Sequence, residues 1–261
     1  MDTEQCTEIT SNSTPLRQGD ILLFKSKCES EKYGIVITGD CDIIQNKCRQ
    51  IISYCTITTV KYYISTELLY DICISSEISK VEKNITKTVC KMLRAQESNT
   101  FLSTLLGRDN SDIKNLLNNN EKLVNKILQL KEIKSKMEFS LDDYKKLFKM
   151  NTDSDLGEEK ITKVKDKILS KLNSLPGDKY YITEIPNQND NFGYIVHLRL
   201  INTISQKEIE NQTDLYRIGH LEAPYLYRLT QKLGAVFSDI GEPQLFEDSR
   251  TEINKMLCKE L

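Results

Sequence analysis

Two carboxylates flank a thiol in the segment GIVITGDCDIIQNK, residues 34–47, whose first part is an apolar run typical of a buried strand. If the strand continues through the segment, alternation places Asp40 and Asp42 on one face and Cys41 on the other. The carboxylates and the thiol would then not act together. A turn in which an aspartate accepts hydrogen bonds from backbone N–H groups and Cys41 packs inward explains the same residues without a ligand.

Only two histidines are available to extend this segment into a reaction centre. A metal site would add His197 or His220 to the two carboxylates of residues 40–42. A nucleophilic Cys41 would need one of the same histidines as its base. The spacing supports neither arrangement. We therefore expect no metal and no cofactor.

An arginine near the end of the chain is the candidate partner of the two aspartates. If the last strand lies beside the strand of residues 33–38, Arg217 can pair with Asp40 or Asp42 and lock the fold as a buried ion pair. The functional alternative makes the same cluster a pocket for a phosphate or a base. The residues of this lock or pocket are Asp40, Asp42, Gln45, Asn46, Arg217 and His220.

Two pairs of neighbouring tyrosines each have a lysine beside them. They are Tyr62 and Tyr63 with Lys61, and Tyr180 and Tyr181 with Lys179. Such groups can stack nucleic-acid bases and contact phosphates. Paired tyrosines at strand ends are also ordinary half-buried residues of a sheet. Both interpretations stay open.

Composition indicates a folded protein. The 261 residues are 39% apolar and 28% charged, which is ordinary for a globular chain. The sequence contains neither a signal-peptide pattern nor a run of about 18 apolar residues. We expect a cytoplasmic protein that does not enter a membrane. The eight cysteines form no C-x-x-C pair, and Cys55, Cys73 and Cys90 lie in apolar patterns that favour buried thiols.

Charge is distributed unevenly along the chain. Residues 80–175 hold 20 Lys/Arg against 14 Asp/Glu, a balance of +6, and the total of −2 leaves −8 for the rest. Basic helices of this kind can bind RNA or DNA. A solvated helical surface rich in lysine has the same composition, so charge alone does not name a partner.

The pattern of apolar residues predicts strands at both ends of the chain and helices between them. Residues 1–15 are polar, and we expect a flexible arm. Strand patterns cover residues 16–75 and resume over residues 176–245, and a helical insertion is expected over residues 76–175. A final amphipathic stretch, residues 246–261, is expected to cap the domain as a helix.

The order RQGDILLF, a variable loop, GIVITGD and then IISYCTIT resembles the PemK/MazF family of small β-barrel toxins. The segment LYRIGHLEAPYLYRLTQKLGAVF is similar to the closing strand and helix of that family. The resemblance implies an α+β fold: a small, bent SH3-like β-barrel built from both chain ends, with a helical insertion and a C-terminal helix. The GIVITGDCDIIQNK segment, taken with RIGHLEAPY, also resembles uncharacterised bacterial proteins of defence-type operons.

Membership of the PemK/MazF family would imply a toxin that cleaves single-stranded RNA. The family's threonine at the end of the third strand corresponds to Thr56 or Thr58, and its Arg-Pro before the second strand is replaced by Lys32 and Tyr33. Lysine lacks the bidentate fork of arginine. We therefore expect a non-catalytic binding or regulatory module of a conflict system, and the alternative is an endoribonuclease. A protein partner from a neighbouring gene, RNA or DNA, and a homodimer are the expected contacts.

Overall fold

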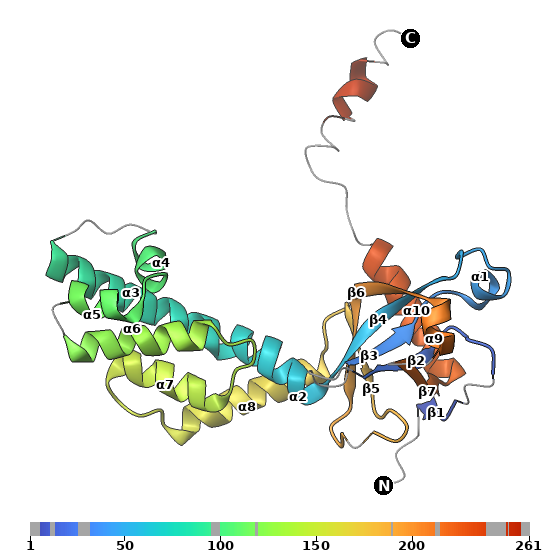
Figure 1. Ribbon diagram of the computed structural model, residues 1–261, viewed down its shortest axis with the longest axis horizontal. Coiled ribbons are helices and arrows are strands. Elements are labelled where there is room, and N and C mark those ends of the chain that lie inside the picture. Colours follow the sequence, from blue (N-terminus) through green and yellow to red (C-terminus); the bar gives the residue numbers. More distant parts are fainter. Residues whose placement is uncertain are drawn as a thin grey trace. The chain divides into compact units, whose positions relative to one another are not determined.

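The computed structural model describes residues 6–10, 14–25, 32–94, 100–117, 120–188, 190–211, 215–238, 249 and 251–256. The chain divides into two compact units (Figure 1), a sheet unit made of residues 1–59 and 176–261 and a helical unit made of residues 60–175. The expected α+β class is confirmed. The helical part starts at Val60, so the boundary expected at residue 76 is wrong.

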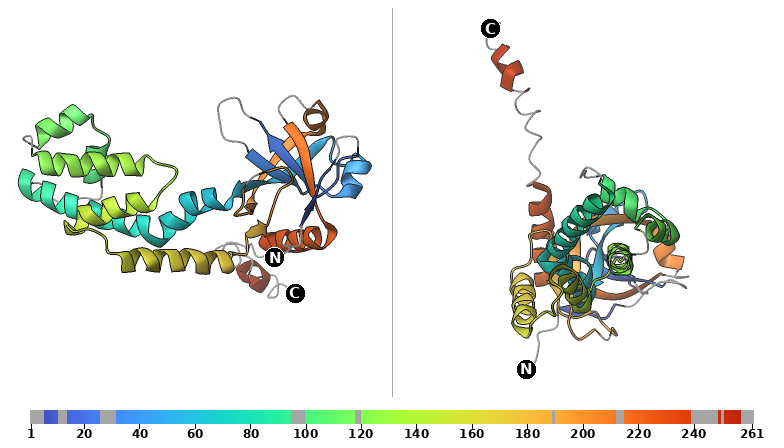
Figure 2. Two further views of the ribbon diagram at one scale, coloured as in Figure 1. Left: turned by 90° about the horizontal axis from the view of Figure 1, so that it is seen from below. Right: turned by 90° about the vertical axis from the view of Figure 1, so that its left-hand side faces the viewer.

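Within the described residues, the sheet unit contains one sheet of seven strands. The strands are β1 (Thr7–Glu8), β2 (Asp20–Phe24), β3 (Lys32–Val36), β4 (Ile51–Thr59), β5 (Lys179–Ile182), β6 (Tyr194–Ser205) and β7 (Leu215–Leu221). Their order is β1-β7-β2-β3-β4-β6-β5, and neighbouring strands are antiparallel. Figure 2 shows that the sheet is strongly curled.

Each face of the sheet packs on its own apolar cluster. On the inner face, Cys55 and Ile57 of β4 pack with Tyr194 and with Leu229 of helix α10 (Ala223–Ser238). The outer face has a smaller cluster, to which helices α1 (Asp40–Ile44) and α9 (Gln206–Asn211) contribute one buried isoleucine each. Alternation along β4 therefore separates the core from an outer face that is apolar at one end and polar at the other.

The described residues at the two ends of the chain do not form the flexible arm and the capping helix expected from the sequence. Thr7–Glu8 of the expected arm form the edge strand β1, which pairs with β7, and Cys6 is buried. Residues 1–5 and 11–13 lie outside the described part. Of the expected capping helix, residues 251–256 are helical with all six side chains exposed, so these residues do not cap a core. The rest of that segment, apart from residue 249, also lies outside the described residues.

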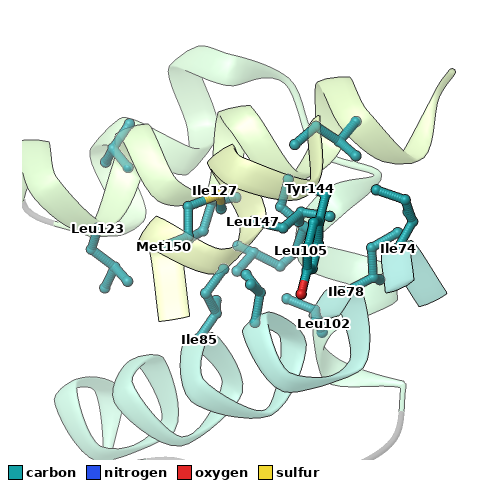
Figure 3. Packing of buried hydrophobic residues seen from close by; sticks show 14 of the residues in the cluster. Ile74, Ile78, Ile85, Leu102, Leu105, Leu123, Ile127, Tyr144, Leu147 and Met150 are labelled. Carbon is teal, nitrogen blue, oxygen red and sulfur yellow. The ribbon is translucent and has the colours of Figure 1, made fainter. Parts of the chain in front are cut away.

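Helices alone make up the described part of the helical unit. They are α2 (Val60–Tyr63), the π-helical turns η1 (Ile64–Leu68) and η2 (Tyr70–Ile74), α3 (Ser75–Leu93), α4 (Phe101–Leu106), α5 (Asn110–Leu116), α6 (Glu121–Lys134), α7 (Leu141–Thr152) and α8 (Glu158–Asn173). Their apolar faces meet in a separate core, part of which Figure 3 shows, with Ile85, Ile127 and Leu147 among its buried side chains. No described helix is both long enough and apolar enough to cross a membrane.

The first turn of α7 is closed by a capping box, which allows a direct test of this unit. Ser140 Oγ accepts from the backbone N–H of Asp143 at 3.3 Å, and the Asp143 carboxylate accepts from the Ser140 N–H at 2.9 Å. We expect Ser140→Ala to lower the free energy of unfolding by about 1 kcal/mol. The matched control is Ser135→Ala at an exposed helix end, expected within about 0.5 kcal/mol of wild type. Urea unfolding of both variants is monitored by circular dichroism. Equal unfolding midpoints for the two variants would contradict the expectation.

Candidate functional site

Asp20, at the first position of β2, is the centre of a buried charged cluster that also contains Arg217 and His220 of β7. The Asp20 side chain is fully buried. Its carboxylate lies 2.9 Å from Arg217 Nη2 and 3.0 Å from His220 Nδ1, and it accepts from the Arg17 backbone N–H at 2.8 Å. These three contacts hold the start of β2 against β7. We call the three side chains the Asp20 cluster.

A β-bulge explains how Arg217 and His220 reach one carboxylate. The two residues are three positions apart, so in a regular strand they would point to opposite faces. The pairing of β2 with β7 shifts between Ile21 and Leu22, which leaves Ile218 as the extra residue. Such an extra residue re-aims its neighbours, and both side chains contact Asp20.

The remaining contacts of Arg217 tie the cluster to the segment before β2, although the buried Arg217 Nε has no hydrogen-bond partner among the described residues. Its guanidinium donates to the Thr14 carbonyl oxygen at 2.6 Å and to the Pro15 carbonyl oxygen at 3.2 Å. Burial lowers the pKa of Arg217, and the Asp20 carboxylate opposes this shift. Arg217 therefore pairs with Asp20 and not with Asp40 or Asp42, and the expectation of that pairing is wrong. Of the two alternatives for Arg217 and His220, a structural lock fits their buried positions better than an open pocket for a ligand.

The Asp40-Cys41-Asp42 segment starts the short helix α1, so the strand does not continue through it. Asp40 is exposed, and one carboxylate oxygen accepts from the Gln18 backbone N–H at 2.7 Å. Cys41 is exposed and lies 3.6 Å from the Asp42 carboxylate, measured from Sγ. The Asp40 contact agrees with an aspartate that accepts from a backbone N–H, whereas the expectation that Cys41 packs inward is wrong, because its side chain is exposed at the start of α1.

The two amides that follow α1 are both exposed. Gln45 is exposed at the C-cap of α1. Asn46 is also exposed, has a positive φ of 50° and accepts from the Gln50 backbone N–H at 3.1 Å. Asn46 therefore shapes the turn by a local bond to the backbone.

A second polar site lies on the outer face, where β4 meets β6. Thr58 Oγ1 lies 2.8 Å from Nε2 of the buried His197. Burial, helped by the positive charge of Lys179 and opposed by Asp178, lowers the pKa of His197 to about 4. The imidazole is therefore neutral at pH 7 and can accept a hydrogen bond from the Thr58 hydroxyl.

Strand register brings further residues of the sequence analysis onto the same face. Tyr33 pairs with Ile57, so Lys32 and Thr58 lie side by side at the next position and point to the outer face. Thr56 pairs with His197, and its hydroxyl accepts from Asn202. Thr56, Thr58 and Lys32 thus share one face.

Positive charge extends this face across β5 and β6. Lys179 pairs with His197 across the two strands. Asp178 lies 3.8 Å from both Lys179 Nζ and Arg199 Nε, and the Arg199 side chain is 61% exposed. We call Lys32, Thr58, His197, Lys179 and Arg199 the polar sheet face. Asp178 is the carboxylate that lies beside Lys179, whose side chain is 12% exposed, and beside the exposed Arg199.

The tyrosine pairs are placed differently from one another. Tyr62 and Tyr63, with Lys61, lie in helix α2 and not at a strand end. Tyr180 belongs to the inner core and donates to the Tyr225 carbonyl oxygen. Tyr181 pairs with Ile195 on the outer face, is 43% exposed, and covers Gly193, where a Cβ would lie 2.4 Å from its hydroxyl. Only Tyr181 of the four thus extends the polar sheet face.

No metal-binding group of cysteines and histidines occurs in the described residues. Cys55, Cys73 and Cys90 are buried, as expected, and burial raises the pKa of Cys55 to about 12 and that of Cys73 to about 11. No group of three or more His, Cys, Asp or Glu side chains suited to a metal occurs there. The two histidines instead hydrogen-bond Thr58 and Asp20.

Comparison with protein-family models, with curated proteins and with solved structures finds no match to this chain. The geometry of the site is therefore the basis for a functional assignment.

Proposed function

We propose that the chain is a non-catalytic binding module of a bacterial conflict system and that it holds single-stranded RNA on the polar sheet face. The observation that carries the proposal is the placement of Lys32, Thr58, His197 and Lys179 on one face of neighbouring strands. The cations suit phosphates, and the Thr58 hydroxyl, held in place by the buried His197, suits ribose hydroxyls and base edges. Tyr181 adds a half-exposed ring for base stacking.

The proposal includes an SH3-like barrel of the PemK/MazF type. The curl of the antiparallel sheet and the closing order of β7 followed by α10 support it. A module of this type would act with a protein partner from a neighbouring gene or with a second copy of the chain. RNA binding remains the property that the polar sheet face itself supports.

Removal of the three cations of the polar sheet face tests the proposal. Wild type and the variant Lys32→Gln/Lys179→Gln/Arg199→Gln are titrated against a fluorescent 20-nucleotide RNA of mixed sequence, with anisotropy as the readout. We expect at least about tenfold weaker binding for the variant. The slope of log K against log salt should fall by about 2, because each lost phosphate contact removes about 0.7 from it.

The matched control removes three exposed cations elsewhere in the sheet unit: Lys47→Gln, Lys207→Gln and Arg228→Gln. We expect this control to keep the wild-type affinity within about twofold, because its cations lie outside the polar sheet face. If the two triple variants weaken binding equally, or if wild type does not bind the RNA, the proposal is overturned.

The second candidate function is RNA cleavage, and the hydrogen bond between Thr58 and His197 favours it. In that reaction the ribose 2′-oxygen attacks the neighbouring phosphorus, its proton passes to Thr58 Oγ1, and the Thr58 hydroxyl proton moves to Nε2 of the buried His197. The bond from phosphorus to the 5′-oxygen breaks, and this oxygen takes the proton back from the imidazolium through the Thr58 hydroxyl. Lys32 would donate to the phosphoryl oxygens as charge develops.

Incubation of the same RNA with purified protein separates the two candidates. The cleavage proposal expects a 2′,3′-cyclic phosphate product whose formation is lost in His197→Gln and reduced at least about 100-fold in Thr58→Val. The control Thr56→Val should retain activity, because Thr56 bonds Asn202. If the RNA stays intact with wild type, cleavage is excluded and the binding proposal stands. If wild type cleaves the RNA and both His197→Gln and Thr58→Val lose this activity, the proposal that the module is non-catalytic is overturned.

A further inference from the structure

Helix α3 carries a row of cations on the helical unit. Lys83, Lys87 and Lys91 follow one another at intervals of four residues, and Arg94 stands at the C-cap. All four side chains are exposed. Four residues advance about 6 Å along a helix and turn it by only 40°. The four cations therefore form one row, which we call the α3 row.

Eight of the 16 other lysines of the helical unit form salt bridges among the described residues. Lys80, Lys122, Lys126, Lys134, Lys136, Lys145, Lys149 and Lys163 each form a salt bridge. Among the described residues, no salt bridge reaches the α3 row. Like charges four residues apart destabilise a helix. The cations of the α3 row therefore repel one another along the helix. A partner with regularly spaced negative charges would offset this repulsion.

The neighbours of the α3 row favour a nucleic acid over a lipid surface. Asn84 and Thr88, which border the row, are exposed and polar. The opposite side of the helix, with Val81, Ile85 and Val89, is buried in the core of the unit. A helix that lies in a membrane surface needs a row of apolar side chains next to its cations, and here, among the described residues, only one exposed apolar side chain, that of Met92 at 36%, stands beside the row. A phosphodiester backbone needs only the row of charges.

We propose that Lys83, Lys87, Lys91 and Arg94 bind the phosphate backbone of a nucleic acid without reading its sequence. This surface is separate from the polar sheet face, because it belongs to the other unit and shares no residue with it. The inference does not rest on the proposed function of the sheet unit. Each surface is tested by its own variants.

The test uses the full chain and compares two triple variants of equal charge. The row variant is Lys83→Gln/Lys87→Gln/Lys91→Gln, and the control is Lys122→Gln/Lys145→Gln/Lys163→Gln, whose lysines are exposed and salt-bridged. Binding of a 20-nucleotide RNA and of a 20-base-pair DNA of mixed sequence is measured between 50 and 200 mM salt. We expect the row variant to lower the salt slope by about 2 for the RNA or by about 2.7 for the DNA. The control should keep the wild-type slope.

Two results would overturn the inference. The first is an equal loss in the two triple variants, which would assign the effect to net charge alone. The second is unchanged nucleic-acid binding by the row variant together with loss of its binding to vesicles containing 30% phosphatidylserine, which would assign the row to a membrane. The variant Lys32→Gln/Lys179→Gln/Arg199→Gln distinguishes the two proposals. If only this variant loses RNA binding, the polar sheet face binds RNA and the α3 row does not.

Discussion

Asp20→Ala should destabilise the sheet unit by about 3 to 5 kcal/mol, the cost of leaving a buried cation without its partner. The variant removes a carboxylate that is fully buried and contacts both Arg217 and His220. The chain has no tryptophan, so amide hydrogen exchange with mass spectrometry is the suitable measurement. Peptides from β2 and β7 should exchange at least about 100-fold faster than in wild type, since each 1.4 kcal/mol is a factor of ten.

The control for Asp20 is Asp40→Ala, which removes an exposed carboxylate with one hydrogen bond from a backbone N–H. We expect a loss of about 1 kcal/mol or less. Adding Arg217→Met to Asp20→Ala should recover at least about 1 kcal/mol of the free energy of unfolding. The double variant no longer leaves the Arg217 charge buried without its carboxylate partner. Strictly additive effects of these two substitutions would show that the Asp20 cluster is not a coupled lock.

The partner of Arg217 illustrates why part of the site escapes sequence reasoning. Alternation in β7 sends Arg217 and His220 to opposite faces, and only the bulge at Ile218 brings them to one carboxylate. Gly19 and Asp20 read as an ordinary turn signal before β2. The available signal was an acidic residue at the first position of an otherwise apolar strand, which requires a buried partner.

The start of the helical unit was missed for a related reason. VKYYI, residues 60–64, is rich in β-branched and aromatic residues and favours a strand. The buried side chains of Tyr63 and Leu68 are five residues apart, as are those of Leu69 and Ile74. The helix accommodates these intervals by two π-helical turns, whose hydrogen bonds span five residues. A search for the 3.6-residue period does not detect such a segment.

Longer elements were predictable because their periodicity is regular. The apolar stripe of α6, with Leu123, Ile127 and Leu130, is buried as its spacing indicates, and strands do occupy both ends of the chain. Local patterns do not state which strands become neighbours. Thr58 was identified by resemblance, whereas its hydrogen bond to His197, 139 residues away, depends on the pairing of β4 with β6.

His197 should make the stability of the sheet unit depend on pH in a defined direction. Its pKa falls from 6.5 in the unfolded chain to about 4 in the folded protein, chiefly because it is buried. Between these values the unfolded chain binds more protons, so acid favours unfolding. The stabilisation is fully present above about pH 6.5 and is lost as the pH falls toward 4. From pH 7 to pH 4.5 the loss attributable to His197 should be about 2 kcal/mol.

The variant His197→Gln isolates this effect, because glutamine can keep a hydrogen bond to Thr58 and does not titrate. Acid also protonates carboxylates, but that contribution is common to both proteins and cancels in their difference. Hydrogen exchange of β4 and β6, corrected for the intrinsic rate at each pH, should therefore show a wild-type advantage at pH 7 that shrinks or reverses at pH 4.5. A difference that stays constant over this range would mean that His197 is not held neutral by burial. Its assignment as a neutral hydrogen-bonding group or base for RNA would then fail together with the predicted pH dependence.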